Sequence, residues 1–294
     1  MTSLKDLAFG TELEYEEISR RTMAQAIHSV VGGTISEGGP HLAITVTDAA
    51  GREWKAMNDA SLRNGAEFVT PVLHYEDIEL LQQVVRAIRH AGAQTPETTS
   101  QHVHVDARGL APKQIAHLAK SWYKQEQLIV AAAGTLPRRL QRYTQRTSQT
   151  FLARLEATKE YTMESINKAW FGYYNPTPMH YDSNRYHTLN LNNLWDAHKT
   201  TVEFRLWNGT THAGEVKAHI IFCLAMVAKA MNAKKATAKN PRKYQEYCGK
   251  YDMRVLLLHL GLNGEEFKNT RMHLLKNLQG SAAWKGQRRD HRAA

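Results

Sequence analysis

Few cysteines and no long hydrophobic run restrict what this 294-residue chain can be. Its two cysteines, Cys223 and Cys248, make neither a disulfide framework nor a thiolate metal site. No apolar run is long enough to cross a bilayer, and the acidic residues near the start argue against a secretory signal peptide. We therefore expect a cytoplasmic protein that has no membrane partner.

The sequence also lacks a glycine-rich phosphate loop of the Walker type and any Ser–His or Cys–His signature of a nucleophilic enzyme. Any ATP must therefore bind by another route. Internal repeats and long low-complexity linkers are absent as well. Nothing in the sequence favours a particular oligomeric state.

The charge balance is strongly basic, with a net charge of +10 at pH 7. This balance favours an acidic partner, which would be a nucleotide, a nucleic acid or an acidic peptide. Basic residues concentrate at 229–243 and in a tail that contains Lys285, Arg288, Arg289 and Arg292. Solvated faces or disordered ends are the alternative interpretation of both groups.

Hydrophobic periodicity predicts an α+β protein with a sheet of about six antiparallel strands, seven at most, and helices packed on one face. The expected strands lie within residues 9–16, 41–48, 52–58, 65–70, 101–107, 185–192 and 201–207. The expected helices lie within residues 19–31, 75–90, 112–133, 138–168, 216–231, 251–260 and 265–278. Residues 1–212 would form the main domain, and the helical residues 213–294, with the basic tail, would pack on it.

The first strand, residues 9–16, organises this prediction because its side chains alternate between apolar and acidic. One face can be buried, whereas Glu12, Glu14 and Glu16 form a row of carboxylates on the other. Like charges this close repel, and a divalent cation between them would offset the repulsion. The alternative is the solvated outer face of a half-buried strand.

Four later strands repeat the same division between apolar and polar faces. If their apolar faces share the side covered by helices, the other face collects Glu12, Glu14, Glu67, His102, His104, Asp106, Asn190, Glu203 and Arg205. Carboxylates with one or two imidazoles are suitable ligands for Mg²⁺ or Mn²⁺, and an arginine can grip a phosphate with two hydrogen bonds. The pattern predicts a nucleotide phosphate held by metal ions on the sheet.

Each part of this pattern also has another interpretation. The His102-x-His104 pair could belong to a cupin-type iron or manganese site, although the usual later ligands are not evident. His104 alone could be a hydrogen-bonded structural residue. Arg205 and Glu203 could form a surface ion pair that contributes little.

Four motifs occur in order over about residues 8–210: Phe9-Gly10-x-Glu12-x-Glu14, Asn64-Gly65-x-Glu67 with Pro71, His102-x-His104, and Thr201-Val202-Glu203-Phe204-Arg205. As a set, they resemble the amidoligase family of the glutamine synthetase and glutamate–cysteine ligase superfamily. The resemblance implies a curved, glutamine synthetase-like sheet whose face opposite the helices holds ATP and Mg²⁺, with Mn²⁺ as an alternative. It also implies a carboxylate–amine ligase that joins a small-molecule or peptide carboxylate to an amine through an acyl phosphate.

The resemblance further implies roles for individual residues. The metal ligands would be Glu12, Glu14, Glu67, His104 and Glu203. Arg205 would hold the transferred phosphate beside Glu203, with Arg185 as a second candidate. Nucleotide contacts would come from His102, Arg205 and Arg142, and substrate contacts from Asn190 and Asp59.

Alternatives remain at both levels. Asn190 and Asp59 could serve only as strand-end or turn residues. Arg142 could lie on a solvated helix face with Arg138 and Arg146. The protein as a whole could be a metal-dependent phosphohydrolase on the same face, or a basic protein that binds nucleic acid through residues 229–243 and the tail.

Overall fold

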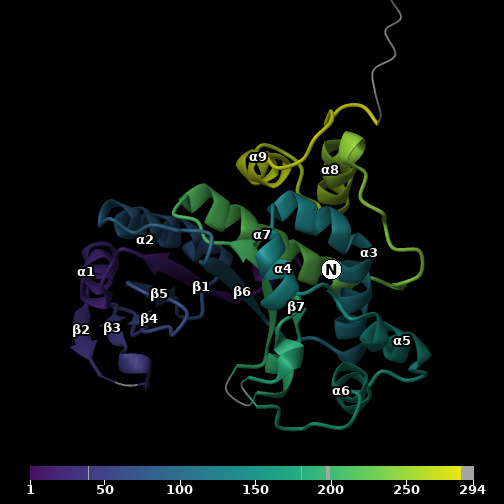
Figure 1. The fold of residues 1–294 in the computed structure, drawn as a ribbon, viewed down its shortest axis with the longest axis horizontal. Coiled ribbons are helices and arrows are strands. Elements are labelled where there is room, and N and C mark those ends of the chain that lie inside the picture. The colour runs from purple at the N-terminus through teal and green to yellow at the C-terminus, as the bar shows by residue number, and fades with distance from the viewer. Residues whose placement is uncertain (39, 180, 197–198, 286–294) are drawn as a thin grey trace, which may run out of the picture.

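A computed structural model describes residues 1–38, 40–179, 181–196 and 199–285 (Figure 1). Its centre is an eight-stranded sheet in the order β2-β3-β4-β5-β1-β6-β8-β7. Every neighbouring pair of strands is antiparallel, and the sheet is open. The strands are β1 (Phe9–Glu16), β2 (Thr34–Glu37), β3 (Ile44–Thr47), β4 (Glu53–Met57), β5 (Gly65–Val69), β6 (Ser100–Asp106), β7 (Leu189–Asn190) and β8 (Thr201–Asn208).

Helices α1, α2 and α7 lie together along the sheet, and α8 and α9 lie beyond α7 and α3 (Figure 1). The helices are α1 (Arg20–Val31), α2 (Ile78–His90), α3 (Pro112–Ala133), α4 (Pro137–Arg142), α5 (Gln149–Ala157), α6 (Met163–Phe171), α7 (Ala213–Asn232), α8 (Gly249–His259) and α9 (Lys268–Leu275). In the described part of the chain, every helix is too short or too polar to cross a membrane.

The core forms where the apolar faces of the strands meet these helices. In β1, the alternate residues Phe9, Leu13 and Tyr15 are buried. The covered side is fixed by contacts across the layers, because His219 of α7 stacks on Trp207 of β8, with 4.0 Å between ring centroids. The side chains that alternate with this set therefore point to the other face of the sheet.

Local sequence explains where several helices begin and end. The hydroxyl of Ser19 accepts a hydrogen bond from the N–H of Thr22 and so caps α1. Helix α3 begins with Pro112 at its first position and ends at Gly134, whose left-handed backbone (φ 62°) suits glycine. Helix α7 is buried around most of its circumference because it packs between the sheet and the outer helices.

The mixed α/β architecture and the antiparallel sheet agree with the sequence prediction, but the expected number of about six strands is wrong. Hydrophobic periodicity does not predict strand β2, because all four of its residues are exposed and it pairs only with β3 at the edge of the sheet. The predicted strand 185–192 is reduced to Leu189–Asn190, and 3-10 turns occupy Ser183–Arg185 and Asn192–Trp195 on either side.

The C-terminal helices pack on the rest of the chain. Helix α7 contacts β1, β6, α2 and α3, and it therefore packs directly on residues of the predicted main domain. Helices α8 and α9 pack on α3 and α7. Of the basic tail, Lys285 is the last described residue, and Arg288, Arg289 and Arg292 lie outside the described residues.

Candidate functional site

The pairing of β1 with its two neighbours places four polar side chains on one face of the sheet. Glu14 lies directly opposite Glu67 of β5, and Glu12 lies directly opposite His102 of β6. Residues that face each other across antiparallel strands share a face. This face is opposite to the one that carries Phe9 and Leu13 and that packs on the helices.

Strands β6, β7 and β8 add three more groups to the same face. His104 of β6 lies opposite Glu203, and Asn190 of β7 also pairs with Glu203. The register of β6 and β8 shifts between Gln101 and Val103, where β8 contains one residue more than β6. The two residues between Phe204 and Trp207, Arg205 and Leu206, lie opposite the single residue His102, so Arg205 is part of a bulge.

Glu12, His102 and Glu203 form the first group of candidate metal ligands, called here the Glu12 cluster; one ligand atom of each lies within 4.8 Å of the others. His102 Nδ1 lies 3.2 Å from Glu12 Oε2 and 3.5 Å from Glu203 Oε1. His104 Nε2 lies 3.3 Å from Glu12 Oε1. That buried nitrogen has no hydrogen-bond partner among the described residues, so a ligand could use it.

Burial and neighbouring charges set the protonation of this cluster. Burial, followed by the positive charge of Arg205, lowers the pKa of His102 to about 4. Burial alone would raise the pKa of Glu12, but His104, His102 and Lys199 hold it well below its usual range. At neutral pH the cluster therefore offers a neutral imidazole and ionised carboxylates, which are the forms that bind metal ions.

Glu14, Asp59 and Glu67 form a second group, the Glu14 cluster, whose carboxylate oxygens also lie within 4.8 Å of one another. Burial, with the nearby charge of Asp59, raises the pKa of Glu14 to about 7. Burial and the charges of Glu12 and Glu14 raise the pKa of Glu67 well above its usual range. Carboxylates that repel in this way suit a divalent cation with oxygen ligands, such as Mg²⁺ or Mn²⁺.

Arg205 completes the charged face and is held by Glu203. Its Nη1 lies 2.5 Å from Glu203 Oε1, and both side chains are buried. Glu203 Oε2 accepts a second hydrogen bond from Asn190 Nδ2 at 2.6 Å. Burial would raise the pKa of Glu203, but Arg205, then His104 and His102, hold it well below its usual range. The Nε of Arg205 is buried without a hydrogen-bond partner in the described structure, which leaves a donor for a ligand.

A family model described as "Putative amidoligase enzyme" matches residues 5–227. The chain belongs to the amidoligase family. The match covers all eight strands and most of α7, and therefore includes both clusters. Family membership supports an enzyme of the ligase type. No curated protein matches the chain.

In this amidoligase, two features hold β5 beside β1. At Gly65 the backbones of β5 and β1 lie too close together for a side chain, because a Cβ there would lie 2.0 Å from the carbonyl oxygen of Tyr15. The third acidic residue of β1, Glu16, accepts hydrogen bonds from the N–H groups of Arg63 and Asn64 at 3.0 and 2.8 Å. Glu16 thus fixes the turn before β5, which explains why it joins neither cluster.

A cavity of about 210 Å³ adjoins the Glu12 cluster. Its lining includes Glu12, His104, Pro71 and Lys199. Lys199 Nζ lies 3.9 Å from Glu12 Oε1. A cavity with a carboxylate, an imidazole and an ammonium on its wall can receive a small charged ligand.

Besides His104, Asn190 and Arg205, three more residues predicted from the sequence belong to neither cluster: Arg185, Arg142 and Asp106. The guanidinium carbon of Arg185 lies 5.7 Å from the centroid of the Tyr186 ring. The guanidinium carbon of Arg205 lies 6.0 Å from the same centroid. Arg142 is exposed and stacks on the ring of Tyr143. Asp106 is paired with exposed Arg108 at 2.8 Å.

Arg139 and Ser100 lie next to the site, although the sequence pattern predicts a role for neither. Arg139 is buried, and its guanidinium donates to the carbonyl oxygens of Arg205 and Trp207 at 2.9 and 2.5 Å. Ser100 Oγ lies 3.1 Å from His102 Nε2. No sequence periodicity distinguishes Arg139 from the neighbouring arginines of the 138–142 segment. Arg139 differs from them because the docking of α4 against β8 buries its side chain.

Proposed function

We propose that this amidoligase is an ATP- and Mg²⁺-dependent carboxylate–amine ligase, with Mn²⁺ as an alternative ion. Its active site would be the face of the sheet opposite α1 and α7. The observation that carries the proposal is that two clusters of candidate metal ligands meet along β1. A buried guanidinium, Arg205, interacts with carboxylates of both clusters.

The reaction brings together negatively charged groups, a carboxylate and a triphosphate. Catalysis therefore depends on neutralising charge and on positioning the reacting atoms more than on a protein nucleophile. Bound Mg²⁺ supplies charge neutralisation and orients the phosphate oxygens. The carboxylates of the two clusters, with His104, would hold it, and the carboxylates of the Glu14 cluster would lose protons as they bind it.

The proposed chemistry has two steps. First, a carboxylate oxygen of the substrate attacks the γ-phosphorus of ATP, the bond to the β-phosphate oxygen breaks, and ADP leaves. Next, the amine nitrogen attacks the acyl carbon, the carbon–oxygen bond to phosphate breaks, and the amine proton passes to water. The products are an amide, ADP and phosphate.

Arg205 is the proposed grip on the transferred phosphate. Glu203 orients its guanidinium through one Nη atom, and the buried Nε remains for an anion. Arg185 is the second candidate, because its guanidinium and that of Arg205 both lie over the ring of Tyr186. His102 would contact the nucleotide.

The substrate contacts are proposed on position alone. Asn190 lies beside Glu203 at the edge of the Glu12 cluster. Asp59 lies in the Glu14 cluster, where it could bind either the second metal ion or an amine. Arg142 is exposed, and it could reach a nucleotide only at the periphery of the site.

The decisive experiment measures ADP release by the full chain with ATP and Mg²⁺, with and without mixtures of carboxylates and amines. A ligase releases ADP only when both an acid and an amine are present. The variant Glu203→Gln should lose this activity, because it removes the charge that holds both Arg205 and the metal. The matched control is Glu53→Gln, since Glu53 is exposed on β4 and pairs only with Lys55 among the described residues.

Release of ADP without any acid or amine would instead indicate a phosphohydrolase on the same face. Full activity in Glu203→Gln would contradict the assignment of the site. Activity that is lost in Glu53→Gln as well would show that the effect is not specific to the cluster.

A further inference from the structure

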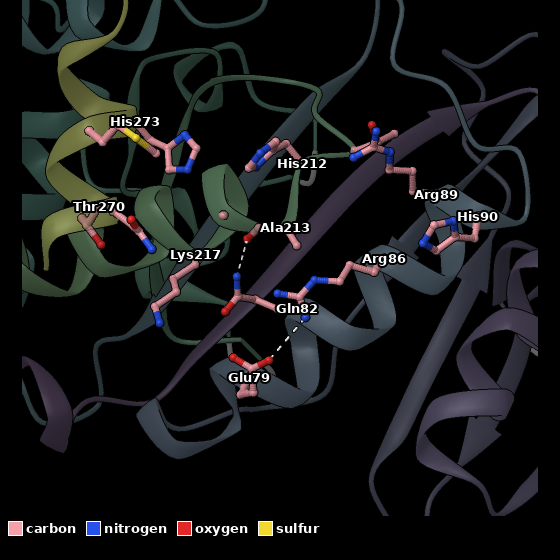
Figure 2. A pocket seen from close by; sticks show the side chains of 14 residues that line it. Glu79, Gln82, Arg86, Arg89, His90, His212, Ala213, Lys217, Thr270 and His273 are labelled. Carbon is pink, nitrogen blue, oxygen red and sulfur yellow. Dashed lines mark hydrogen bonds and ion pairs between the residues drawn. The ribbon is translucent and has the colours of Figure 1, made fainter. Parts of the chain in front are cut away.

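A third group of candidate metal ligands lies on the helical side of the sheet, away from the proposed active site. It adjoins a cavity of about 540 Å³ between α2, the start of α7, and α9 (Figure 2). Cationic residues Arg86, Arg89 and Lys217 line this cavity, together with His212 and His273. None of these residues takes part in the chemistry proposed above.

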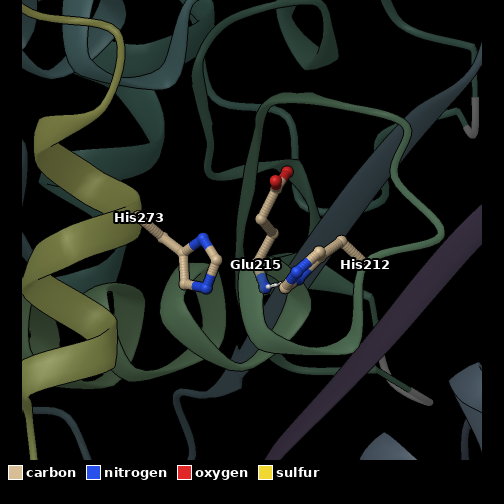
Figure 3. Close-up of side chains that lie close together, drawn as sticks. All are labelled: His212, Glu215 and His273. Carbon is tan, nitrogen blue, oxygen red and sulfur yellow. Dashed lines mark hydrogen bonds between the residues drawn. The ribbon is translucent and has the colours of Figure 1, made fainter.

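His212, Glu215 and His273 converge beside this cavity. One ligand atom from each residue lies within 4.8 Å of the others. His212 is the N-cap residue of α7, Glu215 is in its first turn, and His273 comes from α9. Figure 3 shows the two imidazoles on either side of the start of α7. The packing of α7 on α9 holds all three in place.

Gly214 leaves open the space in which the two imidazoles meet. A Cβ at position 214 would lie 2.7 Å from His273 Nε2 and 3.2 Å from His212 Nδ1. Both nitrogens therefore border one small volume above the glycine. Any larger residue would fill that volume, although alanine is the better residue for a helix.

Nδ1 of His212 can give up its present hydrogen bond at little cost in free energy. Its Nδ1 accepts a 3.3 Å hydrogen bond from the N–H of Glu215, but the same N–H also donates to the carbonyl oxygen of His212 at 2.9 Å. If a metal ion takes the lone pair of Nδ1, the N–H keeps its other acceptor.

The carboxylate of Glu215 is also available to an ion. Its Oε1 forms an ion pair with Lys276 at 2.6 Å, and its Oε2 accepts a 3.1 Å hydrogen bond from the hydroxyl of Thr210; the Lys276 side chain is 44% exposed. Such a half-exposed ammonium can move into water with small loss, because pairs of this kind contribute little to stability.

We propose that His212, Glu215 and His273 form a binding site for Zn²⁺, or for a related divalent transition metal, that fastens α9 to the first turn of α7. Two imidazoles and one carboxylate are a donor set that suits Zn²⁺, whereas Mg²⁺ prefers oxygen ligands. Water or an anion from the cavity fills the remaining coordination position. The site joins α9, which lies beyond the part matched by the family model, to α7 within it.

The test is a Zn²⁺ titration of the metal-stripped full chain in excess Mg²⁺, with a chromophoric zinc indicator as competitor. Gly214→Ala is the central variant, because it fills the space between the imidazoles and still favours a helix. His273→Asn removes a ligand. His90→Asn is the matched control, since His90 lines the same cavity but is not part of the cluster. His102→Asn controls for zinc that binds on the sheet.

We expect the wild-type chain to bind one Zn²⁺ with a micromolar or lower Kd. His273→Asn should weaken that binding by about 100-fold or more, because loss of a ligand exceeds the effect of an outer-shell partner. Gly214→Ala should have a similar effect, because its Cβ would lie 2.7 Å from His273 Nε2 and occupy the space of the ion. Zinc should raise the Tm of the wild type and of His90→Asn but not that of Gly214→Ala.

Two results would overturn the proposal. One is a wild-type chain with no micromolar zinc site under these conditions. The other is micromolar binding that persists in Gly214→Ala and His273→Asn and disappears in His102→Asn, which would place the zinc on the sheet.

Discussion

Replacing Glu14 with glutamine should make the metal-free protein more stable at high pH. Burial and Asp59 raise the pKa of Glu14 from 4.5 to about 7 in the folded chain. Because the folded state binds this proton more tightly than the unfolded state, the protonated Glu14 carboxyl contributes to the unfolding free energy, and this contribution is complete below pH 4.5. It is lost as the pH rises through about 7.

The size of the effect follows from the same shift. A rise from 4.5 to about 7 corresponds to about 3 kcal/mol of unfolding free energy. With an unfolding entropy of about 2.1 cal/mol/K per residue, this free energy shifts the Tm of a 294-residue chain by about 5 °C. Glutamine has nearly the same shape but cannot ionise, so Glu14→Gln removes the penalty at high pH.

The assay is thermal unfolding followed by circular dichroism in EDTA, from acidic pH to about pH 8. The difference in Tm between Glu14→Gln and wild type should be lowest at acidic pH and should increase by about 5 °C toward the upper end of the pH range. Glu53→Gln, on the exposed surface of β4, should show no such growth. A difference that does not depend on pH would refute the idea that Glu14 is a destabilised buried carboxylate.

Three further predictions address the same face. Adding Mg²⁺ at about pH 8 should raise the Tm of the wild type more than that of Glu14→Gln, and EDTA should reverse the gain; equal gains would mean that the ion binds elsewhere. Arg205→Lys should lower ADP release about 100-fold or more, because an ammonium cannot replace two-pronged binding of phosphate, while Arg21→Lys, at an exposed ion pair, should not. Gly65→Ala should lower the unfolding free energy by roughly 3 kcal/mol, measured in urea, since its Cβ would meet the carbonyl oxygen of Tyr15; Gly109→Ala, with open space around it, is the control.

The side of the sheet on which each residue lies could be predicted from the sequence, because a strand alternates with a period of two. The alternation in β1, β5, β6 and β8 was enough to place Glu12, His102 and Glu203 on a common face, and the observed pairing brings them together. Edge strand β2 could not be predicted in the same way, because it has no buried side.

Long-range contacts from loops and short helices were beyond the reach of periodicity. Asp59 lies in the turn between β4 and β5, and only the folded chain brings its carboxylate to Glu14 and Glu67. Arg139 resembles its neighbours in sequence, but the docking of α4 buries it against β8. His273 meets His212 only because α9 packs on α7.

The two clusters have one strand in common, and this has a consequence for how their spacing could change. Glu12 and Glu14 are successive residues on one face of β1, so their Cα atoms are separated by about 7 Å, the repeat of an extended chain. This distance is fixed by the backbone of the strand, so substitutions of the surrounding side chains cannot lengthen it. Inserting a single residue between Glu12 and Glu14 would not widen the interval but would turn one carboxylate into the apolar core. Two ions held by the Glu12 and Glu14 clusters would therefore keep a nearly constant separation, even if substitutions around the site changed which substrate it accepts.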